Sequence, residues 1–590
     1  MRNKQNVDGA ATSVRIVWLE FDGTYLPPLE AKNYPGDTMK SFQCRLQLEM
    51  NVLQDKPRRG AVATTRHVAV KALGSGAIVL LSFAASAAPG AASCGSLMQL
   101  KIDNTTITSA QYLSTPEGGQ YCEVAATVAP QHDIKIRLPE TWKGRYVQYG
   151  GGGFDGSIPN LSVPSSPMVS TSKDPVNFGF AVIASNGGHR NTEYAAASFS
   201  VDRGLTLSYA TAKMYDTDLV GRTLVKAYYG RDANFHYFAG CSNGGKNASV
   251  VASNFGDYYD GVIGGDGVWG HADDDVKGAD MPGLTAKWSR TVQLGIGLSR
   301  PKGDALYEKT IEACDALDGV KDGLISNVEA CPFKQIARSM QCQSGSGESC
   351  LTEGEIANID AHASELVLDG KVIGAPWSRA GNFGKWGNVV ALPSGFLQMA
   401  FRRPTAVDPL SFDIPTQFAQ VKTVLDDVYN MTGDQAGIVK YLKKGKKLML
   451  FHGWEDMEVP PYTSLNFYKS LRRVEPNATH KNAKLYMVPG MPHCRGGRGA
   501  DASELLHVMA KWVEEGVEPG SYRNPVIAWE RPNNDNTGPQ GVETATFSRP
   551  LCAYPEYPAY SGRGDPISAS SYSCRQGPGR AHDRDGRDDD

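Results

Sequence analysis

Short apolar runs, bounded by glycine and charged residues, recur along the chain and are typical of buried strands. The clearest are residues 145–149, 235–239, 447–451 and 483–488. Each is too short for an ordinary helix and is rich in aromatic and aliphatic side chains. Helical patterns follow two of them, at 246–253 and 502–514. Strands that alternate with helices up to about Gly265, and again from Lys446, predict an α/β fold with an open, mostly parallel sheet.

A serine stands between glycines directly after the second run. Residues 240–245 read Gly-Cys-Ser-Asn-Gly-Gly. A strand that turns sharply into a helix, with glycines where a Cβ would clash, forms a nucleophile elbow and holds the serine hydroxyl clear of the sheet. A Gly-x-Ser-x-Gly match alone is a weak signal in a chain with 64 glycines. The segments that follow strengthen it and favour Ser242 as a nucleophile.

A carboxylate and a histidine follow the last two runs. Asp456 comes after 447–451, and His493 comes after 483–488. Serine, acid and histidine stand in the chain order of an α/β-hydrolase triad. We expect Ser242 to attack an ester carbonyl, His493 to move the proton, and Asp456 to fix the imidazole tautomer. The structural alternatives are a capping carboxylate and a packed loop histidine.

A cysteine adjoins each of two of these residues. Cys241 precedes Ser242, and Cys494 follows His493. If the serine and the histidine are hydrogen-bonded, their neighbours are close enough to be bridged. Such a disulfide would tie the base to the nucleophile.

These three segments together resemble the tannase and feruloyl esterase family, which includes mono(2-hydroxyethyl) terephthalate hydrolases. They are the Cys-Ser-x-Gly-Gly elbow, the His-Gly-Trp-x-Asp segment ending in Val-Pro-Pro, and the Pro-Gly-Met-x-His-Cys segment. The resemblance runs from about Cys94 to Cys574. It implies an α/β-hydrolase core, an inserted lid domain with a bound calcium ion, and hydrolysis of esters of aromatic acids.

The lid calcium has a matching segment at 315–324, which carries three carboxylates and two glycines. Calcium prefers six to eight oxygen ligands. By resemblance the ligands are the Asp315, Asp318 and Asp322 side chains and the backbone carbonyls of Val320 and Leu324. The alternative is a solvated acidic turn.

Stabilisation of an oxyanion needs two backbone N–H donors, one of them on the residue after the nucleophile. Asn243 supplies the first. The run at 145–149 leads into four glycines, and we favour Gly151 or Gly152 as the second donor.

Composition is that of a large globular enzyme. The 590-residue chain is 41% hydrophobic, and its net charge of −3 gives no electrostatic case for nucleic-acid binding. Ten of its eleven cysteines lie between Cys94 and Cys574. Resemblance and proximity pair them as Cys94–Cys122, Cys241–Cys494, Cys314–Cys331, Cys342–Cys350 and Cys552–Cys574. Such a framework implies an oxidising compartment, either periplasmic or extracellular.

An export signal stands in an unusual place. Basic residues precede the apolar stretch 72–85, and Ala85-Ser86-Ala87 offers a cleavage site. The stretch is short for a membrane span, so we expect no stable membrane insertion after signal removal. The predicted organisation is an N-terminal extension and signal peptide (1–87), a catalytic domain (88–269 and 431–574), a loop-rich lid (270–430) and a disordered polar tail (575–590).

Two segments depart from the family pattern. Asn186 stands where relatives usually have an aspartate, and residues 264–269 replace an Ala-Pro-Ala-like stretch. Neither segment is part of the triad, so both bear on the substrate pocket and not on the reaction class. The sequence therefore predicts a secreted serine esterase acting on a small aromatic ester, of the hydroxycinnamic, gallic or terephthalic type. A serine peptidase of the same fold, a thiol hydrolase using Cys241, and a non-catalytic calcium-dependent binding module are the alternatives.

Overall fold

The computed structural model describes residues 90–577, apart from 163–165, 170–172, 192–196, 273–275, 296, 522 and 532–544. The expected extension and signal peptide, and the tail beyond Gly577, lie outside the described residues.

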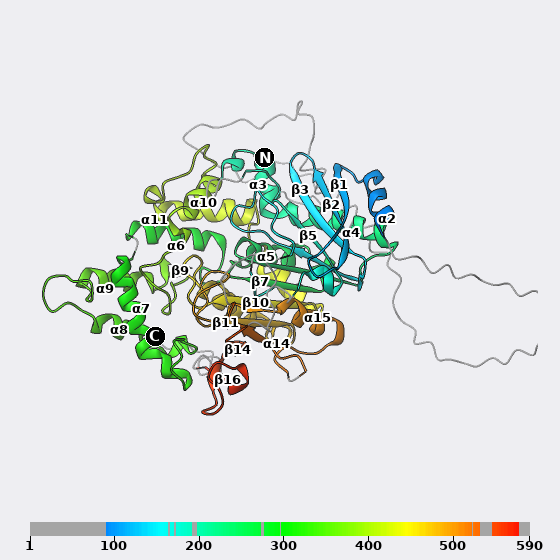
Figure 1. Ribbon diagram of the computed structural model, residues 1–590. Helices are drawn as coiled ribbons and strands as arrows, with labels where there is room; N and C mark the ends of the chain where they lie inside the picture. The colour runs from blue at the N-terminus through cyan, green and yellow to red at the C-terminus, as the bar shows by residue number, and fades with distance from the viewer. Residues whose placement is uncertain are drawn as a thin grey trace, which may run out of the picture. The chain divides into compact units, whose positions relative to one another are not determined.

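A nine-stranded mixed sheet forms the centre of the fold, with strand order β1-β2-β3-β5-β4-β6-β7-β10-β11 (Figure 1). Its strands are β1 (Thr105–Ser114), β2 (Gln120–Val128), β3 (His132–Pro139), β4 (Arg145–Tyr149), β5 (Phe180–Ser185), β6 (Phe235–Cys241), β7 (Gly261–Gly265), β10 (Lys447–Gly453) and β11 (Ala483–Val488). The first three strands follow one another as antiparallel neighbours without helices between them, which corrects the expected alternation. From β5 to β11 all neighbours are parallel. This is the sheet of an α/β-hydrolase-like fold.

Alternate residues of the central strands pack against different layers. In β10, Leu448 and Leu450 join the hydrophobic cluster that contains α5 (Asn243–Asn254), whereas Met449 and Phe451 join the cluster that contains α15 (Leu505–Glu515). Successive side chains of a strand point to opposite faces, so both faces of the sheet are covered. The other helices around the sheet are α2 (Ala91–Ser96), α3 (Arg203–Leu207), α4 (Lys213–Tyr229), α13 (Tyr462–Val474) and α14 (Pro476–Asn482).

The chain between β7 and β10, which the sequence analysis expected to be loop-rich, contains helices joined by turns and loops. It contains α6 (Met281–Gln293), α7 (Arg300–Cys314), α8 (Phe333–Ser339), α9 (Glu353–His362), α10 (Leu392–Phe401), α11 (Ile414–Lys422), α12 (Gln435–Lys443) and the hairpin β8–β9 (Leu366–Leu368, Lys371–Gly374). Four of these helices carry proline in their first turn. Proline is favoured there because the first N–H groups of a helix need no intrahelical partner. The prolines of these four helices therefore mark helix starts.

Two expectations near the C-terminus are wrong in detail. Ala502 and Ser503 form strand β12, which pairs with β13 (Ile527–Trp529), and α15 begins only at Leu505. β13 also pairs with β14 (Ser548–Pro550). The tail was expected to start at Arg575, but β16 (Tyr572–Gln576) pairs with β15 (Glu556–Tyr560). Pairing with β15 therefore orders the chain through Gln576.

Five disulfides join the cysteines in the pairs that the sequence analysis expected. None of the helices in the described part of the chain is long and apolar enough to cross a membrane.

Candidate active site

Ser242 lies at the turn between β6 and α5 in a backbone conformation that only a constrained turn imposes. Its φ is 62° and its ψ is −120°. The glycines on either side let backbone segments touch, since a Cβ on Gly240 would lie 2.7 Å from the Cα of Gly244. This is the geometry of a nucleophile elbow, in which a non-glycine residue is held at positive φ.

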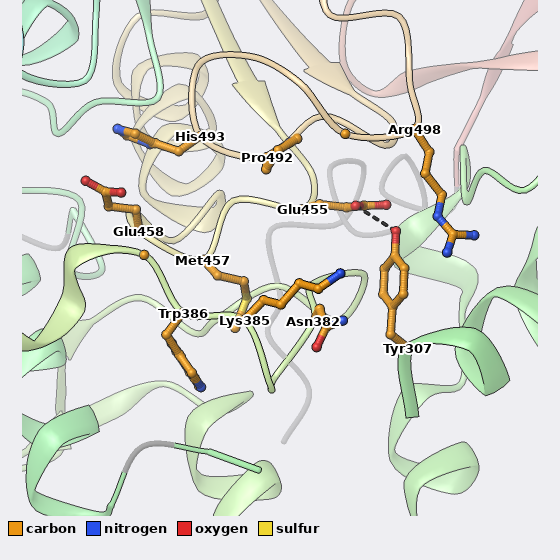
Figure 2. Close-up of a pocket in the computed structure, with 12 residues that line it drawn as sticks. Tyr307, Asn382, Lys385, Trp386, Glu455, Met457, Glu458, Pro492, His493 and Arg498 are labelled. Atoms are coloured by element: carbon orange, nitrogen blue, oxygen red, sulfur yellow. Dashed lines mark hydrogen bonds between the residues drawn. The ribbon is translucent and has the colours of Figure 1, made fainter. Parts of the chain in front are cut away.

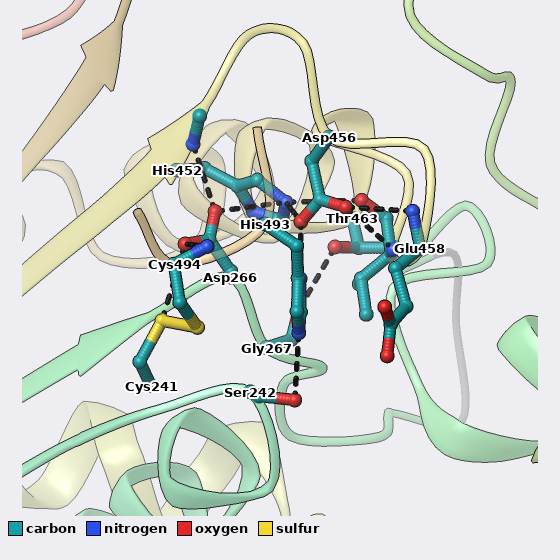
Figure 3. Close-up of polar contacts among 12 residues, drawn as sticks. Cys241, Ser242, Asp266, Gly267, His452, Asp456, Glu458, Thr463, His493 and Cys494 are labelled. Carbon is teal, nitrogen blue, oxygen red and sulfur yellow. Dashed lines mark hydrogen bonds and ion pairs between the residues drawn. A yellow bond between two sulfur atoms is a disulfide. The ribbon is translucent and has the colours of Figure 1, made fainter. Parts of the chain in front are cut away.

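The structure brings Ser242, His493 and Asp456 into one hydrogen-bonded line (Figure 3). His493 Nε2 lies 2.8 Å from Ser242 Oγ, and His493 Nδ1 lies 2.6 Å from Asp456 Oδ2. The carboxylate accepts from Nδ1–H, so Nε2 is left without a proton and faces the serine hydroxyl. The arrangement can remove a proton from Ser242.

Asp456, the acid of this hydrogen-bonded line, is fully buried, and both of its carboxylate oxygens accept hydrogen bonds. Asp456 Oδ1 accepts the backbone N–H groups of Glu458 and Val459 at 2.7 and 2.9 Å. Burial raises its pKa, but His493 and His452 lower it by more, so the group is held ionised. Burial likewise lowers the pKa of His493, but the carboxylates of Asp456, Glu458 and Asp266 together raise it above its usual value. The acid therefore stabilises the imidazolium that forms when the serine loses its proton.

A second buried carboxylate, which the sequence analysis did not assign to the site, joins the loops of the acid and the base. Asp266 follows β7 directly, and its two oxygens accept the backbone N–H groups of Gly453 at 2.8 Å and Cys494 at 2.9 Å. The carboxylate has no exposed surface, and Oδ2 lies 3.1 Å from Cys241 Sγ. Burial raises the pKa of Asp266 to about 6, against the opposing effect of His452. Asp266 is thus a positioning residue.

His452 fills the space between the two carboxylates. Its Nδ1 lies 2.7 Å from Ser464 Oγ, which itself accepts the Trp269 indole N–H at 2.8 Å. On the other side of the ring, Nε2 lies 3.1 Å from the Val459 carbonyl oxygen, which can only accept, so Nε2 carries a proton and donates. That nitrogen is 3.2 Å from Asp456 Oδ2 and 3.4 Å from Asp266 Oδ1. Polar residues at the ends of neighbouring parallel strands were the available signal for both missed residues.

We expect Asp266→Ala to lower both stability and kcat. The variant leaves two buried N–H groups without an acceptor, each at a cost of about 1–3 kcal/mol. It also loosens the His493 loop, and a misplaced catalytic group costs on the order of a hundredfold in rate. Thermal melting and ester turnover measure the two effects. Asp266→Asn keeps one carbonyl acceptor and should be milder on both, whereas wild-type values for Asp266→Ala would contradict the positioning role.

The Cys241–Cys494 disulfide lies directly beside this network (Figure 3). It joins the residue before Ser242 to the residue after His493, with a Cα–Cα distance of 6.0 Å. Cys241 is thus a disulfide cysteine, which speaks against the thiol-hydrolase alternative.

Two cavities meet at the triad. One, of about 400 Å³, is lined by His493 and by residues of the helical insert, including Tyr307, Lys385 and Trp386 (Figure 2). The other is lined by Ser242, Asn243 and an aromatic group of Phe154, Tyr209, Trp288 and Phe396. Its free space is about 40 Å³, so an aromatic ring enters only after side chains move. Glu458 lines both cavities.

Of the residues predicted to supply oxyanion donors, Asn243 lines the cavity that contains Ser242, and Gly151 and Gly152 do not. Asn243 is the first residue of α5, where N–H groups have no intrahelical partner, and it lines the Ser242 cavity. Its side chain is held by Asp155 and by the Tyr209 hydroxyl. Gly151 is buried and Gly152 is exposed. Neither lines that cavity, whereas the next residue, Gly153, does. The second backbone N–H donor to the oxyanion, from Gly151 or Gly152, stays a prediction.

The acidic loop at 315–324 is folded on its own carboxylates. Asp315 accepts the N–H groups of Asp322 and Gly323, each at 3.0 Å, and Asp318 Oδ1 accepts that of Val320 at 3.2 Å. Asp318 Oδ2 is buried without a hydrogen-bond partner in the described chain, and burial raises the pKa of this group to about 6. An unpaired buried carboxylate oxygen among acidic neighbours is the environment that a hard cation satisfies.

Two side chains would compete with a cation for Asp322. The Arg549 guanidinium and the Tyr572 hydroxyl both donate to Asp322 Oδ2. The three carboxylates do not lie within 4.8 Å of one another as a compact group in the described structure. A cation that used all three would draw Asp318 and Asp322 inward.

Asn186 is one of the two departures from the family pattern seen in the sequence, and it has a structural role. Its side-chain oxygen accepts the N–H groups of Asp133 and Gly188 at 3.0 and 3.1 Å. It fixes the turn after β5.

Comparison with solved structures finds the same fold in known esterases. The solved structure of feruloyl esterase B from Aspergillus oryzae superposes with a TM-score of 0.69 at 20% identity, covering 82% of this chain and 100% of that one. The tannin acyl hydrolase of Aspergillus niger gives 0.62 at 19% identity, with 82% and 95% covered. Both show the shared fold.

The sequence of the chain is also similar to those of known ester hydrolases. The mono(2-hydroxyethyl) terephthalate hydrolase of Piscinibacter sakaiensis is 25% identical over 539 residues, which cover 78% of this chain and 85% of that protein. The family model "Tannase and feruloyl esterase" matches residues 117–364 and 379–575. The chain therefore belongs to the tannase and feruloyl esterase family and is a carboxylic ester hydrolase.

Proposed function

We propose that this enzyme hydrolyses esters of aromatic carboxylic acids through an acyl-enzyme on Ser242. The observation that carries the proposal is the hydrogen-bonded line from Ser242 through His493 to Asp456, which opens onto a cavity with four aromatic side chains. Aromatic walls suit an aromatic acyl group because they bury its apolar faces.

The proposed mechanism uses the chain's own groups. Ser242 Oγ attacks the ester carbonyl while His493 Nε2 takes its proton, and Asp456 holds the resulting imidazolium. The Asn243 N–H faces the developing oxyanion, and His493 then protonates the departing alcohol. Water attacks the acyl-enzyme with His493 as base, which releases the acid and restores the serine.

Substrate panels separate this proposal from its alternatives. Methyl ferulate, methyl gallate and a terephthalate monoester should be hydrolysed, whereas the matching amides should not. Faster turnover of the amides would favour a peptidase of the same fold. A fluorophosphonate probe followed by intact-mass measurement should label Ser242 stoichiometrically, and an unlabelled protein would favour a non-catalytic binding module.

We also propose a structural calcium ion in the 315–324 loop. The Asp315, Asp318 and Asp322 side chains would hold it, with the carbonyls of Val320 and Leu324. The support is the unpartnered Asp318 oxygen and the hard-oxygen donor set. The loop lies in the insert, and neither cavity at the triad includes its residues, so we assign the ion no chemical step.

Chelation should therefore lower the thermal midpoint before it lowers activity. A metal that binds only the folded protein stabilises it by about 2.7 kcal/mol when its concentration is roughly a hundredfold above Kd. Melting and ester turnover are measured in parallel during an EGTA titration well below the midpoint. Asp318→Ala should mimic chelation and no longer respond to added calcium. Immediate, calcium-reversible loss of turnover with unchanged melting would place the ion in the chemistry instead.

We further propose that the protein is exported, to the periplasm or the medium. The support is the set of five disulfides, which persist in oxidising compartments.

A further inference from the structure

We propose that Glu458 makes the enzyme selective for esters whose acid part carries no negative charge. This inference rests on the proposed function and narrows it, since it favours neutral phenolic acids over acids with a second carboxylate. It starts from the position of one side chain at the junction of the two cavities.

Glu458 follows the catalytic acid by two residues and lies where the two cavities adjoin. It lines the cavity on the His493 side and the cavity on the Ser242 side. Figure 3 shows its carboxylate pointing the same way as the His493 ring, toward the level of Ser242. An ester that reaches the nucleophile therefore passes this charge, whichever cavity takes its acid part.

The insert holds this carboxylate in place. The Asn388 side-chain amide lies 3.2 Å from each Glu458 carboxylate oxygen. The backbone of Gly387 packs against the same group, since a Cβ there would lie 2.6 Å from Glu458 Oε2. A fixed charge repels a like charge more effectively than one that can swing into solvent.

The lysine and arginine side chains that line the two cavities are not free to bind a substrate carboxylate. Lys246 is the one described lysine or arginine that lines the Ser242 cavity. It is buried, its ammonium lies over the Tyr209 ring, and burial together with Lys213 lowers its pKa well below the usual range.

The other cavity has two cations, and each has an acidic partner. Lys385 lies 3.5 Å from Asp304, and Arg498 pairs with Glu308. Glu455 lines the same cavity. A substrate carboxylate would therefore meet Glu458 without a free opposite charge among the described lining residues.

Two substrates that differ only in charge test the inference. They are methyl 4-carbamoylbenzoate, which is neutral, and methyl 4-carboxybenzoate, which is an anion at pH 7. We expect wild-type kcat/KM to favour the neutral ester by about tenfold, the size of one charge repulsion in a partly solvated site. Glu458→Gln keeps the shape of the side chain and should abolish most of this ratio. Using a ratio removes any general effect of the substitution on His493.

The control is Glu312→Gln, on the exposed face of α7, which makes the same change in net charge and lines neither cavity. It should keep the wild-type ratio. In wild type, raising ionic strength to about 1 M should shrink the ratio, because it shortens the screening length to about 3 Å. The salt dependence tests for charge repulsion of the anionic ester even if the Glu458 variant fails to fold.

Three results would overturn the inference. The first is a ratio in Glu458→Gln within twofold of wild type, and the second is faster wild-type hydrolysis of the anion. The third is failure to hydrolyse either ester together with methyl ferulate, which would overturn the proposed function as well.

Discussion

Ser242→Ala is expected to lower kcat by on the order of a millionfold while the fold and thermal midpoint stay nearly unchanged. The hydroxyl is the atom that forms the acyl-enzyme, and His493 is its hydrogen-bond partner in the described structure. Its removal leaves no large cavity. Initial rates on methyl ferulate and thermal melting measure the two quantities.

The control is Ser96→Ala, at the end of α2, where the hydroxyl donates to a backbone carbonyl in an exposed position. It should keep full activity. More than about one per cent residual turnover in Ser242→Ala, after contaminating wild type is excluded by mass, would show that another group is the nucleophile.

Asp456→Asn is expected to lower kcat by about ten thousandfold. Asp456 Oδ1 accepts two backbone N–H groups, so the amide oxygen of an asparagine would occupy that position and its NH₂ would face His493 Nδ1. The imidazole proton would then move to Nε2. A protonated Nε2 cannot accept the Ser242 proton.

The pH profile distinguishes this cause from simple misfolding. Asp456 raises the pKa of His493, so the variant should show its remaining base titrating at lower pH than wild type. Asp408→Asn changes an exposed capping carboxylate and should leave the profile unaltered. A variant with unchanged kcat and an unshifted profile would remove Asp456 from the triad.

Sequence reasoning found the triad because each member follows a buried strand of the parallel part of the sheet. Carboxyl ends of parallel strands share one edge, so local patterns at three distant positions predict one site. The sequence analysis did not identify Asp266 and His452, because their role depends on which strands are neighbours in the sheet. Gly265 pairs with Phe451 across β7 and β10, which places the next residue of each segment, Asp266 and His452, side by side.

The insert was harder to predict. The sequence analysis expected a loop-rich segment there and gave no helix bounds, although four of its helices have a proline in the first turn. Tertiary packing decides their conformation, since one hydrophobic cluster runs from Val262 in the sheet through Trp288 to Phe396 in the insert. The shapes of both cavities depend on that packing and could not be read from the sequence.

The Cys241–Cys494 bond also determines what a protease can do to this enzyme. The two cysteines are 253 positions apart, and the whole insert lies between them. A single cut in the insert therefore yields two chains that stay covalently joined next to Ser242 and His493. Nicked enzyme would migrate as one species on a non-reducing gel and as two fragments after reduction, so the triad can outlast a break in the insert.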